Sequence, residues 1–171
     1  TFKPYTKSTR GTILVDRTGL WKGKPFKALV EPKSSMRGRN NNGHITSRNM
    51  SGGGHKQMYR VVDFYRKKID MPGTVERIEY DPNRSCYIML VKFDDGQHFY
   101  YLAPQKIQVG DKVENGPEKE IKVGNCMPLR DIPVGINIHN VELKPGAGGK
   151  IARSAGTSVT ISGLDGNYSL I

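Results

Sequence analysis

The sequence predicts a mainly β protein in which an extended N-terminal arm precedes small β-barrels. Short apolar runs after residue 57 are separated by turn residues about every 8 to 12 positions, as in small barrels. The chain has 20 Gly and 10 Pro among 171 residues and a hydrophobic content of only 36%, which indicates much loop. Residues 1–70 carry 16 Lys and Arg against 4 Asp and Glu, a net of +12, whereas residues 71–171 carry 11 against 12, a net of −1. This asymmetry is typical of a nucleic-acid-binding arm joined to a neutral folded body.

The arm is expected to span residues 1–56. Its first 36 residues contain Pro4, Pro25 and Pro32 and show no sustained helical period, so they are expected to be extended. Two apolar groups, Leu20 with Trp21 and residues 26–30, are expected to anchor the arm to the body.

Residues 37–56 form a loop rich in Gly, Asn and Arg. A segment with so little apolar surface cannot offset the entropy of its own ordering, so we expect it to become ordered only against a partner rich in negative charge. Arg, Lys and Asn donors beside bare Gly backbone suit phosphate and sugar edges, which favours nucleic acid, and RNA over DNA. A solvated basic tail or a plain flexible linker through the Gly triplet at 52–54 is the simpler alternative. A membrane surface is disfavoured, because the region has no amphipathic apolar stripe.

Residues 57–127 are predicted to form a first barrel. Residues 57–64 alternate in polarity, 74–80 is a second short run, and 86–93 meets 97–102 across Asp94-Asp95-Gly96, a strong hairpin pattern. Residues 80–83 are predicted to turn around Pro82.

Residues 128–171 are predicted to begin a second barrel, with strands at 136–143 and 157–161 around a loop at 144–154. A turn at 164–167 should lead into a last strand at 168–171. About 44 residues are too few to close a barrel, so that strand is expected to leave an edge that another segment covers.

Cations outside the arm are spaced by small residues in the same way. Lys144, Lys150 and Arg153 are separated by Gly and Ala, and Arg84 follows the turn at Pro82. Short loops of this kind suit double-stranded RNA, which is read in its shallow minor groove by shape, phosphate and 2′-hydroxyl contacts. For Arg84 by itself, an ordinary exposed charge is the simpler interpretation.

Other chemistry finds little support. The Gly triplet lacks the spacing of a nucleotide-hydrolase phosphate loop, and Ser51, Ser85 and Ser154 lack a nucleophile setting, so no enzyme is expected. The four His have no zinc spacing. Cys86 and Cys126 are most simply two reduced thiols in an intracellular compartment. No apolar run approaches the ~18 residues of a membrane span, and no signal peptide is evident.

Taken in order, several motifs resemble those of the universal "L-two" family of the large ribosomal subunit, in its bacterial or organellar form. They are GRNNNG (38–43), GGGHK (52–56), YRVVDF (59–64), ERIEYDPNRS (76–85), LAP (102–104), GN (124–125), IPVG (132–135), HNVE (139–142) and IARSAGT (151–157). The resemblance implies an extended arm, an OB-like barrel and an SH3-like barrel. It further implies binding of large-subunit rRNA near the peptidyl-transferase region and the subunit interface, in support of assembly, subunit association and tRNA placement.

The rRNA-binding residues expected on both grounds are cations, amides, imidazoles and one phenol. They are Arg37, Arg39, Asn40, Asn41, Asn42, His44, Arg48, His55, Lys56, Tyr59, Arg60, Arg84, Lys144, Lys150 and Arg153. The resemblance makes Arg84 and Arg153 the main rRNA contacts of the two barrels. No cofactor is expected, and magnesium would accompany only the RNA.

Two departures from the family pattern carry expectations of their own. Residues 49–51 read Asn-Met-Ser where the family tends to have Arg-His, which affects the local path. The rest of the SH3-like barrel and a His- and Gly-rich extension are absent, so a second polypeptide is expected to supply them, as from a split organellar gene. The residues of these motifs resemble alpha-proteobacterial and mitochondrial versions of the family, which favours a mitochondrial ribosome over a bacterial one. The alternative function is a free OB-type RNA chaperone or translation factor, which would need Tyr87, Phe99 and Tyr101 exposed for base stacking.

Overall fold

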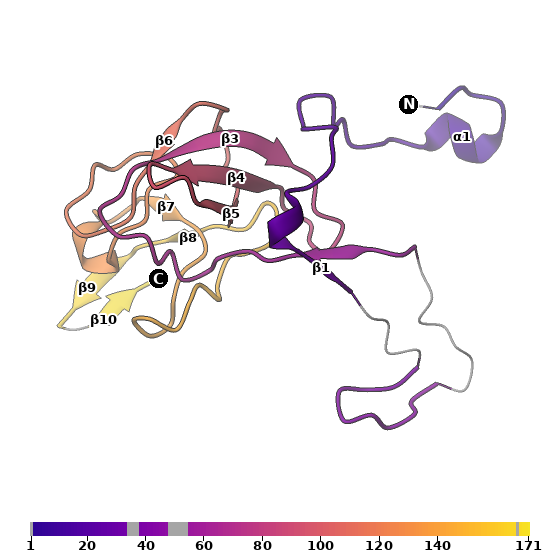
Figure 1. The fold of residues 1–171 in the computed structure, drawn as a ribbon. Helices are drawn as coiled ribbons and strands as arrows, with labels where there is room; N and C mark the ends of the chain where they lie inside the picture. The colour runs from indigo at the N-terminus through magenta and orange to yellow at the C-terminus, as the bar shows by residue number, and fades with distance from the viewer. Residues whose placement is uncertain (1, 34–37, 48–54, 167) are drawn as a thin grey trace.

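A computed structural model describes residues 2–33, 38–47, 55–166 and 168–171. The body is built on a curled antiparallel sheet of four strands in the order β5-β4-β3-β6 (Figure 1). These strands are β3 (Gly73–Glu79), β4 (Ile88–Phe93), β5 (His98–Leu102) and β6 (Lys112–Val113). The other strand pairs of the described chain are β1 (Val30–Pro32) with β2 (Met58–Arg60), β7 (Asn137–Ile138) with β8 (Val159–Thr160), and β9 (Gly163–Asp165) with β10 (Tyr168–Leu170). The predicted fold class, mainly β with an extended arm ahead of small barrels, is confirmed, and the main sheet is a curled half-barrel.

The hairpin predicted across Asp94-Asp95-Gly96 is present between β4 and β5. Phe93 N–H donates to Gln97 O at 3.0 Å, and Gly96 N–H donates to Phe93 O at 2.9 Å. Gly96 has φ +80°, a left-handed conformation that Gly adopts without a steric cost. The turn thereby fixes the register, in which Val91 lies opposite Phe99.

Both faces of β4 are covered, which explains why residues 86–93 are apolar throughout. Alternate side chains of β4 point to opposite faces. The core on one face consists of Val75, Met89, Val91, Phe93, Tyr101, Ile107 and Val113. The core on the other face consists of Val62, Ile88, Leu90, Tyr100 and Leu102, with Phe26, Leu29, Phe64 and Cys86 packed against it. The arm and the segment after β2 therefore provide the outer cover of the sheet.

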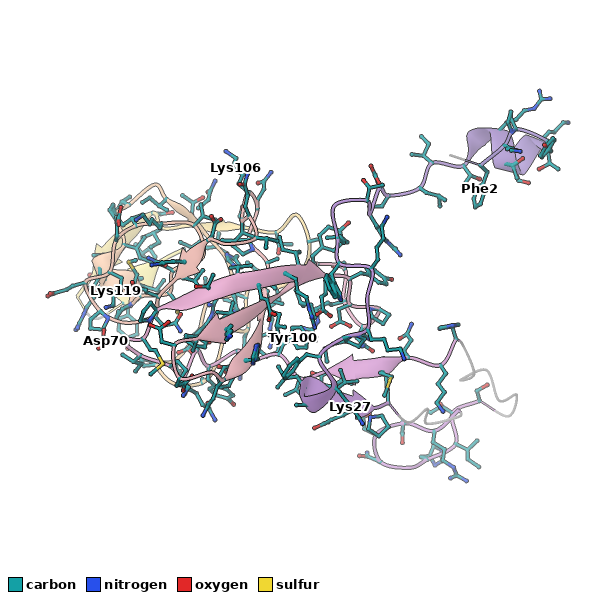
Figure 2. All side chains as sticks on the ribbon, turned by 45° about the horizontal axis from the view of Figure 1, so that its top comes forward. Phe2, Lys27, Asp70, Tyr100, Lys106 and Lys119 are labelled. Carbon is teal, nitrogen blue, oxygen red and sulfur yellow. The ribbon has the colours of Figure 1, made fainter. Side chains whose placement is uncertain are left out.

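The anchors predicted in the arm both contact the body. Phe26 N–H donates to the Tyr100 hydroxyl at 2.8 Å, and the Phe26 ring stacks on His98 with centroids 4.7 Å apart. Trp21 N–H donates to Ile78 O at 2.9 Å, although its side chain stays 50% exposed. Figure 2 shows Tyr100 and Lys27, which begins the 3₁₀ helix Lys27–Leu29, in the same region, well apart from Phe2.

The expectation of a wholly extended arm is wrong at two short helical segments, the 3₁₀ helix Lys27–Leu29 and α1 (Lys7–Gly11), of which α1 lies away from the sheets (Figure 1). Thr6 and Thr9 form a reciprocal cap: Thr6 Oγ1 accepts from Thr9 N at 3.2 Å, and Thr9 Oγ1 accepts from Thr6 N at 2.8 Å. The cap was missed because its fourth residue is Thr and not the usual Glu or Gln.

Several predicted strands are shorter than expected or are displaced. The strand expected at 57–64 ends at Arg60, after which Val62 forms a parallel bridge with Tyr100 and follows β5. The turn at Pro82 begins one residue later than predicted. It spans residues 81–84 and is closed by a hydrogen bond from Arg84 N–H to Asp81 O at 3.4 Å. Residues 57–127 and 128–171 are here called the first and the second unit. In the second unit, β7 and β8 lie within the strands predicted at 136–143 and 157–161.

The last part of the chain forms a hairpin. β9 occupies part of the predicted turn at 164–167, and Tyr168 of β10 lies opposite Asp165 of β9. The strand predicted at 168–171 is thus paired along one side by its own neighbour in sequence.

Candidate nucleic-acid interface

Two cations that are distant in sequence, Arg84 and Arg153, meet at the ring of Phe64. The Arg153 guanidinium carbon lies 3.5 Å from the centroid of this ring, and that of Arg84 lies 5.7 Å from it. They line a pocket of about 370 Å³, here called the Phe64 pocket. Its lining consists of Tyr59, Phe64, Asn83, Arg84, Ser85, Arg153 and Ser154. The structure therefore joins predicted RNA contacts from both units in one concave surface.

Arg84 is positioned by a buried carboxylate. Asp81 is 0% exposed, and its Oδ2 accepts a hydrogen bond from Arg84 Nε at 2.6 Å. Its Oδ1 accepts from Asn83 N at 2.9 Å and from Asn83 Nδ2 at 2.8 Å. A buried charge is tolerated only when it is paired and hydrogen-bonded in this way. The turn thus holds the guanidinium beside the pocket.

Arg153 is positioned by the loop that carries it. Gly149 N–H donates to Phe64 O at 3.0 Å, and Ala155 N–H donates to Ser85 Oγ at 3.1 Å, so the loop is tied to the first unit on both sides of Arg153. A Cβ on Gly149 would lie 2.2 Å from Asn140 Oδ1, which explains why this position requires Gly. The guanidinium then lies over the face of Phe64, a favourable cation–π arrangement.

A second pocket of about 450 Å³ adjoins the first and shares Arg153 and Ser154 with it. Lys150 lines this second pocket, so Arg84, Arg153 and Lys150 follow one another along the surface. Lys144 lies apart on an exposed loop. That loop is closed by the Glu142 carboxylate, which accepts from Gly146 N at 2.8 Å and from Gly148 N at 3.1 Å.

The predicted arm residues are placed elsewhere. Residues 38–47 form a small hairpin that projects away from the sheets (Figure 1). Asn40 Oδ1 accepts from Asn42 N at 3.0 Å and from His44 N at 2.9 Å, and Arg39 Nη1 donates to Gly43 O at 2.8 Å. Local bonds of this kind give the segment a turn of its own, contrary to the expectation that only a polyanion orders it. Asn41, Asn42 and His44 are exposed on this hairpin.

The other predicted residues that the structure describes near this site lie in or just before β2, and Tyr59 of this strand lines the Phe64 pocket. Exposed His55 and Lys56 precede this strand, which carries Tyr59 and Arg60. Asn83 Nδ2 donates to Met58 O at 2.8 Å, which ties β2 to the turn before Arg84. Predicted residues Arg37 and Arg48, together with the Gly triplet at 52–54 and residues 49–51, lie outside the described residues.

Sequence reasoning missed Phe64 and Asp81, which organise the pocket. The sequence did hold an indication for Phe64. In the alternating run it falls on the same side as Arg60 and Val62, which places its ring on the face that carries a predicted RNA contact. Asp81 was recognised only as a turn residue, because nothing in the sequence marks its carboxylate as buried.

The exposed aromatic face required by the chaperone alternative is incomplete. Tyr101 is 0% exposed, and the Arg66 guanidinium carbon lies 3.7 Å from its ring centroid. Burial raises the pKa of the Tyr101 hydroxyl to about 12. Tyr87 and Phe99 are half-buried, and Phe99 packs against the core. Tyr101 at least is unavailable for stacking a base.

The two thiols have little reactive character. Both Cys86 and Cys126 are free, and burial raises the pKa of each thiol above its ordinary value. A raised pKa lowers the fraction of thiolate, the nucleophilic form.

The described parts of the chain contain neither a metal-binding cluster nor a membrane-spanning helix. Residues 2–33, 38–47, 55–166 and 168–171 contain no group of His, Cys, Asp or Glu arranged to hold a metal ion. Over the same ranges, no helix combines the length and apolar character needed to cross a membrane.

Comparison with known proteins shows which family the chain resembles. The family model "Ribosomal Proteins L2, RNA binding N-terminal domain" matches residues 26–115, and "Ribosomal Proteins L2, C-terminal domain" matches residues 122–171. The chain is 96% identical over all 171 residues to "Large ribosomal subunit protein uL2" of Pelagibacter ubique and covers 61% of it. Over 170 residues, 99% of the chain, it is 61% identical to the protein of that name from Granulibacter bethesdensis and 58% identical to that from Rickettsia bellii, covering 61% and 62% of them.

The chain thus spans about three fifths of the length of these relatives, each of which is one longer polypeptide. This comparison does not support the expectation that a separate chain carries the missing part. The relatives come from bacteria, so the preference for a mitochondrion is not supported either. Because one family model matches more than half of its residues, the chain belongs to the ribosomal protein L2 family.

Proposed function

We propose that the chain is a structural, non-enzymatic part of the large ribosomal subunit and acts by binding large-subunit rRNA. The observation that carries this proposal is the meeting of Arg84 and Arg153, from two separate units, over Phe64. Guanidinium groups held in a fixed place suit the phosphate and sugar oxygens that position a protein on RNA. The net charge of +12 over residues 1–70 would add a long-range attraction.

The finer parts of the proposal rest on the family. They are binding near the peptidyl-transferase region and the subunit interface, with support of assembly, subunit association and tRNA placement among neighbouring ribosomal proteins. We place this role in a bacterial ribosome, because the relatives named above are bacterial. The proposed division of the chain is an arm at 1–56, an OB-like barrel at 57–127 and the beginning of an SH3-like barrel at 128–171. The first family model ends at residue 115 and the second begins at residue 122, a few residues before the proposed boundary between 127 and 128.

The proposed rRNA contacts form three groups: arm residues, residues of the strand β2, and cations of the two units. They are Arg37, Arg39, Asn40, Asn41, Asn42, His44, Arg48, His55 and Lys56 in the arm, Tyr59 and Arg60 in β2, and Arg84, Lys144, Lys150 and Arg153 in the units.

Filter binding to a large-subunit rRNA transcript over a range of salt concentrations tests the proposal. The logarithm of the affinity should fall linearly with that of the salt concentration, with a slope of about −0.7 to −0.9 per phosphate contact. Arg153→Ala should weaken binding about tenfold at moderate salt, the ~1.4 kcal/mol expected for one charge-assisted contact. Lys106→Ala removes the same charge at a residue, labelled in Figure 2, that is not among the lining residues of either pocket, and should have little effect. Equal affinities of the two variants would contradict the assigned role of Arg153.

The rival function, a free OB-type chaperone or translation factor, is weakened by the burial of Tyr101. Tight binding to unstructured RNA by a protein that does not sediment with ribosomes would revive it.

A further inference from the structure

We propose that the Phe64 pocket holds a single unpaired nucleotide of the bound RNA, with its base stacked on the Arg153 guanidinium and its phosphate beside Arg84. This inference rests on the proposed function and specifies which part of the RNA the site takes. It differs from the expectation from sequence, in which the barrel loops suit the minor groove of a duplex.

The shape of the pocket is the first argument. The Phe64 pocket is an open depression whose volume of about 370 Å³ leaves room for one nucleotide. A paired duplex presents a broad convex surface and would touch only the rim of such a hollow. A nucleotide turned out of its helix is of the right size to enter it, as unstacked bases do in sequence-specific RNA recognition.

The stack on Phe64 is the second argument. At 3.5 Å from the ring centroid, the planar guanidinium of Arg153 covers one face of Phe64. Arginine guanidinium planes stack on bases, as aromatic rings do. The face of Arg153 that points away from Phe64 can therefore stack on a base. Among the described residues, the buried Arg153 Nε has no hydrogen-bond partner, so no bond within the described protein ties this guanidinium down at Nε.

The chemistry of the lining is the third argument. Tyr59 adds a second aromatic ring that is 37% exposed, Ser154 adds an exposed hydroxyl, and the lining includes no carboxylate. Arg84 is fixed by Asp81, so a phosphate would meet a positioned cation without an added entropic cost. An aromatic and cationic lining with a few neutral donors matches a base linked to a phosphate.

The neighbouring pocket explains why a nucleotide within a strand fits better than a free one. It shares Arg153 and Ser154 with the Phe64 pocket and is lined by Lys150. A phosphate of the adjoining nucleotide would lie along this cation, while the extruded base occupied the Phe64 pocket.

The test uses the whole chain and two RNA hairpins of identical stem, one with a single bulged 2-aminopurine and one fully paired. The wild-type chain should bind the bulged hairpin about tenfold tighter, within the ~1–3 kcal/mol that stacking of one base contributes. Fluorescence of the 2-aminopurine should change on binding, as its base moves onto Arg153. Equal affinities for the two hairpins would overturn the inference.

The variant Arg153→Lys distinguishes the contribution of stacking from that of charge, because lysine keeps the positive charge but has no planar group to stack on a base. It should reduce the preference for the bulge to less than about twofold while leaving affinity for the paired hairpin nearly unchanged. Lys106→Ala is the matched control: it removes a cation outside the lining of both pockets and should leave the preference for the bulge unchanged. An Arg153→Lys chain that unfolds at the wild-type temperature and keeps the full preference would refute the stack.

The two proposals fail in different ways. Salt-dependent binding of both hairpins with equal affinity would remove the nucleotide site and leave rRNA binding intact. Absence of salt-dependent binding to the hairpins and to the rRNA transcript would overturn both.

Discussion

Replacement of Asp81 by Asn should unfold the turn that presents Arg84. The carboxylate is 0% exposed and accepts three hydrogen bonds, from Asn83 N, Asn83 Nδ2 and Arg84 Nε. An amide of the same shape has one accepting oxygen, so its NH₂ group must face at least one of these donors, and Arg84 loses its counter-charge. Breaking a buried ion pair from one side costs about 3–5 kcal/mol, and we expect the lower end because the Arg84 side chain is 16% exposed.

Urea unfolding, followed by circular dichroism, measures this loss. With a slope of about 2 kcal/mol per molar urea, a loss of about 3 kcal/mol lowers the midpoint by about 1.5 M. Asp94→Asn is the matched control, since Asp94 is exposed in the hairpin turn and should change stability by no more than about 0.5 kcal/mol. If Asp81→Asn has the same midpoint as Asp94→Asn, the buried carboxylate does not hold this turn and the account of Arg84 is wrong.

Two further predictions concern the core and the Arg153 loop. Burial raises the pKa of Tyr100 to about 12, above an ordinary value of about 10, so its contribution to stability is complete below pH 10 and is lost as the pH rises toward 12. Tyr100→Phe should lower the free energy of unfolding at pH 7 by about 1–2 kcal/mol, because Phe26 N–H and the buried Glu79 lose a partner, and should show a shallower loss between pH 10 and 12. Urea midpoints at pH 7 and pH 11 check both effects, and an unchanged alkaline slope would count against them. Gly149→Ala should cost about 1–3 kcal/mol, since its Cβ would lie 2.2 Å from Asn140 Oδ1, whereas Gly11→Ala meets no atom within 4 Å and should be tolerated in thermal unfolding.

Features that depend on neighbouring residues were predictable from the sequence. The Asp-Asp-Gly turn needs only a left-handed Gly between two apolar runs, and it forms where predicted. The charge asymmetry and the apolar anchors near Trp21 and Phe26 likewise follow from local composition. The lengths of strands were less predictable: β2 ends at Arg60, and beyond it Val62 forms a bridge to Tyr100, a residue distant in sequence.

The candidate site shows the same division. Arg84 and Arg153 were identified as separate loop cations, but no local pattern indicated that they share one ring. They meet because Phe64 O accepts from Gly149 N and Ser85 Oγ accepts from Ala155 N, two contacts between residues about 70 to 85 positions apart. Contacts at this separation depend on the packing of the two units, which a reading of motifs does not supply.

The bond from Phe26 N–H to the Tyr100 hydroxyl, which in turn donates to Glu79 at 3.0 Å, gives the basic arm a fixed root. Because the arm starts from this fixed point on the sheet, the volume that its charges explore before RNA arrives is limited. Folding therefore already restricts many of the conformations that an unattached basic tail would have to sample before it binds RNA. Loosening this root should slow productive docking even where every cation remains in place.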